Sequence, residues 1–231
     1  MENNTTEVPV NKHYKDTVFR SLFNEKNTLL SLYNAIIGTN YANPDDLSIV
    51  TLENVIYMKH KDDIACTIDL QLALFEHQSS VNPNMPLRYL RYSVDLFAKL
   101  TVGQNIYSKH QILLPNPTFV VLYNGTEPQP ERKIMRLSDS YMGVSNDRES
   151  NLELIVTQLN INDGFNEDLK QKCPELFGYC HFVSLVRSYM KEADSTIEQA
   201  VDKAIDTCID EDILSDFLKA NRKDVKEMSI Y

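Results

Sequence analysis

The chain has 231 residues, a formal net charge of −10, 42% hydrophobic and 24% charged residues. This composition is typical of a globular protein, and the length suits one domain or one domain with a small appendage, since domains hold about 100–200 residues. The negative charge argues against a protein that coats nucleic acid in general. No apolar run reaches the about 18 residues of a membrane span, and residues 1–12 lack the apolar core of a signal peptide. We therefore expect a cytoplasmic protein with no membrane partner.

The charge is uneven along the chain. Residues 85–136 carry 7 basic and 3 acidic residues, so this middle stretch has a net charge of +4 although the whole chain is acidic. A locally basic surface can bind a phosphate backbone with modest, salt-sensitive affinity.

Hydrophobic periodicity predicts the elements of the first part of the chain. Residues 1–12 are polar and are expected to be flexible. Residues 14–37 repeat apolar side chains at helical spacing, and Gly38 suits the end of that helix. Three strands are predicted over residues 47–58, 64–68 and 72–78, with a tight connection between the last two. A helix then begins near Pro86, since proline is tolerated in a first turn.

The second part begins with residues 118–123, an apolar run typical of a buried strand, which ends at Asn124-Gly125. A polar loop over 126–130 and another strand over 152–159 follow. Helical patterns cover residues 175–191, 195–208 and 211–221. The order of helix, three strands, helix and strand predicts an α/β fold with a mixed sheet, followed by C-terminal helices.

Two acidic residues mark the second and third predicted strands. Glu76 and Gln78 share one face, because side chains alternate along a strand, and His77 faces the other way. If the two strands pair as a hairpin, Asp63 lies close to Glu76. Carboxylate and amide oxygens suit Mg²⁺ or Mn²⁺ rather than zinc. A plainer interpretation stays open, in which Asp63 is a turn residue and Glu76 ends a strand in solvent.

The run EHQSSVNPNMPLR from Glu76 to Arg88, with Asp63 before it, resembles the PD-(D/E)XK nuclease superfamily. It is most similar to the bacterial recombination-promoting nuclease (Rpn) and putative transposase group. YKDTVF at 14–19 and LYNGT at 122–126 extend the resemblance over roughly residues 12–160, with weaker similarity in the helical tail. The resemblance implies a restriction-endonuclease-like core of order α-β-β-β-α-β over residues 13–165, a helical C-terminal extension over 166–231, and metal-dependent cleavage of DNA in recombination or transposition.

The same resemblance implies roles for three residues. Asp63 and Glu76 match the metal-binding acids, with Mg²⁺ or Mn²⁺ as cofactor, and Gln78 is the third catalytic residue. The superfamily often has lysine in place of Gln78, where the ammonium orients water and offsets charge on the phosphate. Glutamine is neutral and only donates or accepts hydrogen bonds, so the metal must supply more of the electrostatic stabilisation.

Further polar residues have two interpretations each. Asp16 is either an additional carboxylate of the site or an exposed acid in a first helical turn. Arg88 shares a helix face with Tyr92 and either acts at the site, by supporting the acid pair or contacting phosphate, or is an ordinary exposed arginine. The candidate DNA contacts, two of which alternatively belong to a solvated loop, are Arg91, Tyr92, Arg132 and Lys133.

Two classes of function therefore stay open. The first is an endonuclease that acts on DNA with Mg²⁺ or Mn²⁺, favoured by the retained Asp63, Glu76 and Gln78. The second is a catalytically weak or inactive nuclease-fold relic that binds DNA or protein, favoured by the missing lysine and the net charge of −10. The oligomeric state, a homo-oligomer included, also stays open.

Overall fold

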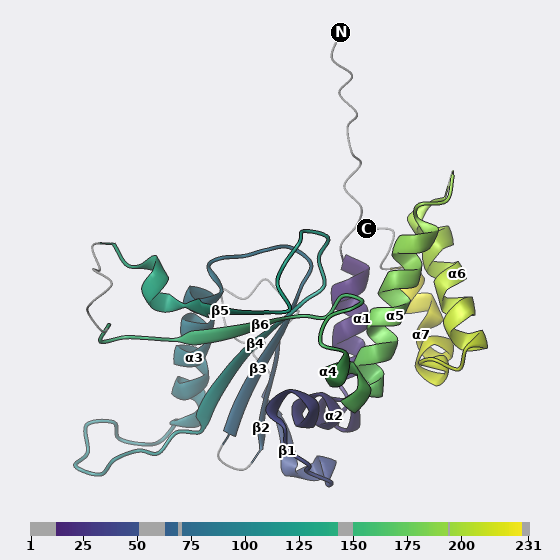
Figure 1. Cartoon of the computed structure of the whole chain (residues 1–231). Coiled ribbons are helices and arrows are strands. Elements are labelled where there is room, and N and C mark those ends of the chain that lie inside the picture. Colours follow the sequence, from purple (N-terminus) through teal and green to yellow (C-terminus); the bar gives the residue numbers. More distant parts are fainter. Residues whose placement is uncertain (1–12, 51–62, 69–70, 143–149, 194, 228–231) are drawn as a thin grey trace.

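The computed structural model describes residues 13–50, 63–68, 71–142, 150–193 and 195–227; of Asp16 and Asp63 it describes the backbone only. These residues form an α/β fold around a six-stranded mixed sheet (Figure 1). The strands are β1 (Leu47–Val50), β2 (Asp63–Ile68), β3 (Gln71–Gln78), β4 (Asn116–Tyr123), β5 (Arg132–Arg136) and β6 (Ile155–Asn160). The helices are α1 (His13–Phe23), α2 (Lys26–Ile37), α3 (Met85–Leu100), α4 (Glu167–Lys172), α5 (Pro174–Tyr189), α6 (Ile197–Asp210) and α7 (Ser215–Glu227), with short 3₁₀ turns at Pro44–Asp46 and Leu137–Ser140.

The strand order is β1-β2-β3-β4-β6-β5. β1, β2 and β3 pair antiparallel, β3, β4 and β6 are mutually parallel, and β5 pairs antiparallel with β6. The parallel strands end in register, because Gln78 lies beside Tyr123 and Tyr123 lies beside Asn160. We call this end of the sheet the carboxyl edge. In open α/β sheets, ligands commonly bind outside the carboxyl ends of parallel strands.

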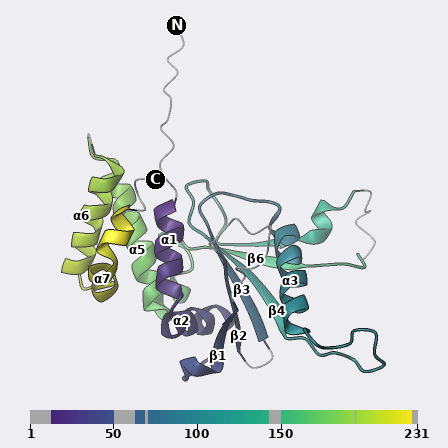
Figure 2. The same cartoon turned by 180° about the vertical axis from the view of Figure 1, so that it is seen from behind.

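Each face of the sheet packs against a separate core. On β3, Leu72 and Leu74 point to the face covered by α3, whereas Ala73 and Phe75 point to the opposite face. That opposite face packs against a larger core to which α1, α2, α5, α6 and α7 contribute. Figures 1 and 2 show α3 on one side of the sheet and the other helices on the second side, with α6 and α7 outermost. None of the helices in the described ranges is long and apolar enough to cross a membrane.

The predicted helix over 14–37 is wrong in its continuity. The chain forms two helices, because Glu25 is extended at φ −89° and ψ 138° and the Thr28 hydroxyl donates to the carbonyls of Leu22 and Glu25. Side-chain bonds of this kind compete with helical backbone bonds. The predicted end at Gly38 is confirmed, since Gly38 has φ 80°.

The later elements differ mainly in their limits. β5 and α4 were not predicted, and α7 begins at Ser215 because the chain turns at Asp212 and Leu214, which have φ of 56° and 50°. Residues 47–50 form β1, whereas the rest of the predicted strand, 51–58, lies outside the described residues. The mixed sheet, the helix after β3 and the C-terminal helices agree with the prediction.

Candidate functional site

The β2–β3 pairing places the two predicted metal acids at the same level of the sheet. The Cα atoms of Asp63 and Glu76 are direct partners in the antiparallel register. Directly opposed residues have Cβ atoms about 4.5–5.5 Å apart and point to the same face. The backbone therefore brings the two positions together, while the Asp63 side chain lies outside the described residues.

Glu76 is a buried carboxylate with a charged partner. It is 3% exposed, and Gln78 on the same face is 6% exposed. The Gln78 amide Nε2 donates to Glu76 Oε1 at 2.8 Å and also lies against the Met85 sulfur. Arg88 Nη1 donates to the same Glu76 oxygen at 2.9 Å. The guanidinium offsets the cost of burying the negative charge, because an ion pair is tolerated where an isolated ion is not.

Arg88 reaches the acid from the first turn of α3. Its Nε and Nη2 donate to the Tyr92 hydroxyl at 3.2 and 2.9 Å, so the predicted shared face of Arg88 and Tyr92 is confirmed. The Arg88 side chain is 24% exposed, whereas that of Glu76 is 4% exposed. The cation of this ion pair therefore borders solvent, and the anion lies behind it.

The oxygen of the Gln78 amide is the most informative atom of the site. Gln78 Oε1 is buried and has no hydrogen-bond partner within the described ranges. A buried acceptor without a partner is costly, and each such case in a folded protein calls for an explanation. A hard cation beside the Glu76 carboxylate would give this oxygen a ligand role, and oxygen donors are those that Mg²⁺ and Mn²⁺ prefer.

The described donors fit such a cation in chemistry but are few. They are Glu76 and Gln78, and no group of three His, Cys, Asp or Glu side chains close enough to hold a metal ion occurs in the described part of the chain. The backbone register makes Asp63 a candidate for a third donor. Asp16 lies on α1, which packs against β2 and β3 on the side of the larger core, and its side chain also lies outside the described residues.

The row that contains Glu76 continues across the sheet. Glu76 pairs with Val121, Val121 with Gln158, and Gln158 with Lys133. Gln158 is 1% exposed and donates to Gln129. Lys133 thus lies at the level of Glu76 but three strands away, about 14 Å at the usual strand spacing.

The remaining predicted DNA contacts are spread over two elements. Arg132 is exposed at the end of β5 that meets the carboxyl edge, and Arg91 is exposed on α3. Tyr92 is 7% exposed and serves as the partner of Arg88. Arg132 and Lys133 lie on an edge strand rather than in a loop. The structure therefore brings Arg88 and Tyr92 to the acid and leaves Arg132 and Lys133 of β5 apart from it.

Polar residues that sequence reasoning missed complete the carboxyl edge. β6 ends in Gln158 and Asn160, which share a face as Glu76 and Gln78 do, and both are buried. The sequence contained a signal for this arrangement. In β3 and in β6, polar residues at every second position end an otherwise apolar strand. β4 lies between β3 and β6 and ends at Tyr123. Burial raises the pKa of the Tyr123 phenol, and the charge of Glu127 raises it further. The phenol is therefore neutral and donates a hydrogen bond to the Glu127 carbonyl.

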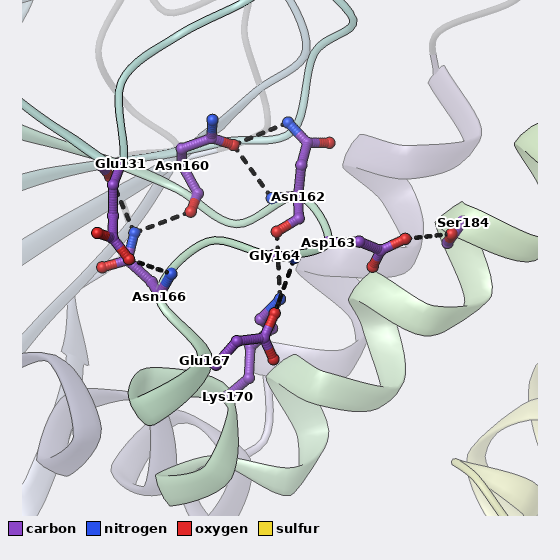
Figure 3. A network of polar contacts seen from close by, with 9 residues as sticks. All are labelled: Glu131, Asn160, Asn162, Asp163, Gly164, Asn166, Glu167, Lys170 and Ser184. Atoms are coloured by element: carbon purple, nitrogen blue, oxygen red, sulfur yellow. Dashed lines mark hydrogen bonds and ion pairs between the residues drawn. The ribbon is translucent and has the colours of Figure 1, made fainter.

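The chain beyond β6 is held by a network of polar contacts (Figure 3). Asn160 Oδ1 accepts hydrogen bonds from the backbone and the side-chain amide of Asn162 at 3.1 and 2.8 Å. Asn166 donates to the Asn160 carbonyl at 2.9 Å and, from its backbone, to Glu131 at 2.7 Å. These bonds tie the start of α4 to the end of β6 and to the residue before β5.

The same network contains a buried lysine. Lys170 is 3% exposed, and its ammonium donates to Glu167 at 2.6 Å and to the Asn162 carbonyl at 3.2 Å. The hydrogen bond from Lys170 is the largest cause that lowers the pKa of the Glu167 carboxyl below its usual value, helped by the Gly164 N–H. The network therefore fixes the loop between β6 and α5 through neutral amides and one ion pair.

A hollow lies elsewhere on the described part of the chain. It measures about 530 Å³ and is lined by residues of the C-terminal part of α3 and of the following loop, among them Phe97, Ile106 and Leu114. Arg88 lies at the opposite end of α3, where it pairs with Glu76 of β3. We place the candidate site at the acid pair, because the hollow contains no buried polar group.

Comparisons of the chain with protein-family models, curated proteins and solved structures find no match. The resemblance to the nuclease superfamily therefore rests on the residues of its motifs.

Proposed function

We propose that this protein is a metal-dependent DNA endonuclease with a restriction-endonuclease-like core, related to the Rpn and putative transposase group. The observation that carries the proposal is the arrangement around Glu76. A buried carboxylate and a buried amide share one face, the backbone of a second acid lies directly opposite, and a guanidinium sits beside them. Metal-assisted hydrolysis of a phosphodiester uses such a combination of anionic metal ligands and a nearby cation.

The residues have distinct tasks in this proposal. Asp63, Glu76 and the Gln78 amide oxygen would hold Mg²⁺ or Mn²⁺. The ion, when bound, acts as a Lewis acid on the phosphoryl oxygen and makes water a better nucleophile at neutral pH. Arg88 leaves the Glu76 carboxylate and stabilises negative charge on the phosphate, a task that lysine performs in many members of the superfamily. The amide N–H of Gln78 orients the attacking water.

Arg88 also supports the second candidate function, a nuclease-fold relic without turnover that binds DNA or protein. In the described structure Arg88 already balances the charge of Glu76, so the carboxylate is neutralised without a metal. If that ion pair is permanent, the acid is structural. The two proposals differ in whether Mg²⁺ or Mn²⁺ displaces Arg88 from Glu76.

The deciding experiment is cleavage of supercoiled plasmid DNA with Mg²⁺ or Mn²⁺. We expect nicked and linear products from the parent protein and none from Asp63→Asn, which keeps the side-chain shape. Asp45→Asn is the matched control, because Asp45 carries an 86% exposed side chain near β1 and pairs only with Lys26 in the described structure. Equal cleavage by the parent and Asp63→Asn contradicts the assignment of the acid pair, and absence of cleavage by the parent favours the relic.

A further inference from the structure

Helix α5 holds the end of β3 from behind the site. The Tyr179 hydroxyl and His77 Nε2 are hydrogen-bonded at 2.8 Å, on the face of β3 opposite to Glu76. The His77 ring also stacks on Phe19 of α1, with ring centroids 5.2 Å apart. His77 therefore joins β3 to α5 and α1.

A second connection runs from α5 to the carboxyl edge. Arg187 Nη2 donates to the carbonyl and the side-chain oxygen of Asn124 at 2.6 and 2.7 Å, and its Nη1 donates to Asn162 Oδ1 at 2.7 Å. The Asn124 N–H in turn donates to the Gln78 carbonyl at 2.8 Å. Asn124 therefore links Arg187 to the backbone of Gln78 by hydrogen bonds on both sides.

The turn held by Arg187 has little freedom to move. Gly125 follows Asn124, and a Cβ atom at Gly125 would lie 2.5 Å from the Ser79 carbonyl and 2.3 Å from the Tyr123 hydroxyl. The turn after β4 therefore lies directly against the residue after Gln78. A displacement of Asn124 must move the end of β3.

Arg187 is held in an unusual way for a cation. Its acceptors are amide and carbonyl oxygens, no carboxylate pairs with it in the described part of the chain, and its buried Nε has no hydrogen-bond partner there. A half-buried charge with an unsatisfied N–H has a cost in stability. The planar guanidinium, however, spans three oxygens from two loops at once, which an ammonium on a flexible stem does not do.

We infer that Arg187 is a positioning residue for the proposed phosphodiester hydrolysis, which acts by holding Asn124 and through it the backbone of Gln78. The inference rests on the proposed nuclease function. It makes α5 part of the scaffold of the site, although the motifs that carry the resemblance to nucleases lie before this helix. Arg187 touches neither substrate nor metal in this assignment.

The first test measures single-turnover cleavage and DNA affinity for Arg187→Gln and Arg187→Lys. We expect both to lower the cleavage rate by about 10- to 100-fold, since small misplacements of reacting groups have effects of this size. The Kd for DNA and its salt dependence should stay at the parent values. Arg222→Gln is the matched control, because Arg222 of α7 forms its ion pairs with Asp202 and Asp206 of α6.

Three outcomes overturn the inference. Recovery of the rate by Arg187→Lys means that only charge matters. A salt slope of DNA binding that falls by about 1 means that Arg187 contacts a phosphate directly. An equal loss in Arg222→Gln means that the effect is general destabilisation.

A second test does not need activity. Amide hydrogen exchange measured by NMR should be faster at Asn124 in Arg187→Gln than in the parent or in Arg222→Gln. The reason is that Arg187 holds Asn124 in place, and the Asn124 N–H is hydrogen-bonded to the Gln78 carbonyl. Unchanged exchange at Asn124 overturns the inference. If the parent protein fails to cleave DNA, the nuclease proposal fails by itself, and the exchange result still decides whether Arg187 holds the end of β3.

Discussion

The end of β3 buries a negative charge, whereas the ends of β4 and β6 hold a positive one, and the two are balanced differently. Glu76 is paired with Arg88, an ion on the solvent side of the pair. Arg187 is surrounded by neutral oxygens of Asn124 and Asn162. An ion pair whose cation borders solvent can exchange that cation for another, while a guanidinium held by three fixed oxygens stays in place. The first region is therefore suited to binding and the second to support.

The largest expected effect tests the binding region around Glu76. Glu76→Gln keeps the shape of the side chain but replaces a charged carboxylate ligand with a neutral amide, so we expect cleavage to fall by at least about 10³-fold, more than the loss of one oriented donor. Calorimetric titration of Mn²⁺ in the presence of DNA should show that the binding heat of the parent is lost. Undiminished Mn²⁺ binding by this variant would place the metal away from β3.

Gln78→Ala should lower single-turnover cleavage by about 10²-fold at saturating Mn²⁺, which is the effect of one oriented hydrogen-bond donor. Gln78→Lys should retain more activity than Gln78→Ala, since lysine is the commoner residue in the superfamily, although its charge repels the metal. Full activity of Gln78→Ala contradicts a role for the amide in the reaction.

The next prediction asks whether the cation of the ion pair is exchangeable. Arg88→Met leaves Glu76 buried without this partner, so the free energy of unfolding without metal should fall by about 1–2 kcal/mol, less than for a fully buried pair because Arg88 borders solvent. Mn²⁺ should then raise the Tm of Arg88→Met more than that of the parent, because no guanidinium competes for Glu76. An equal rise of Tm in both proteins argues for a permanent ion pair.

The smallest expected effect concerns the stability of the supporting region, at Glu167. The pKa of Glu167 is lowered, chiefly by the hydrogen bond from Lys170, so the ionised carboxyl stabilises the folded state above its ordinary pKa and this contribution is lost as the pH falls through the lowered pKa. Glu167→Gln should therefore be less stable than the parent at pH 7 by less than about 1 kcal/mol, given that Glu167 is largely exposed. Thermal unfolding from pH 7 to pH 3 should show the difference vanishing; a difference that persists at pH 3 contradicts the ionic origin.

The sequence allowed the binding region to be predicted better than the supporting one. Asp63, Glu76 and Gln78 belong to adjacent strands of regular periodicity, so alternation and a hairpin suffice to place them. Arg88 follows within the next helix, and its spacing to Tyr92 gave their shared face. Such arguments work because the residues are near in sequence.

The supporting region depends on contacts between distant segments. Nothing in the helical pattern of 175–191 distinguishes Arg187 from an exposed arginine, because its partners, Asn124 and Asn162, follow two different strands. β5 was missed for a related reason. Only Met135 of the five residues of β5 is buried, so the sequence of β5 lacks the apolar alternation that indicates a strand. Its conformation is decided by pairing with β6.

The distance along the chain between the two regions has a consequence for synthesis. β2 and β3 follow each other within two residues, whereas Arg187 is made 109 residues after Gln78. At about 5–20 residues per second, the acid pair leaves the ribosome roughly 5–20 s before the helix that holds it. A two-stranded hairpin alone is marginally stable in water. We therefore expect the nascent chain to be inactive towards the nucleic acids around it until α5 has been made and has packed on the sheet.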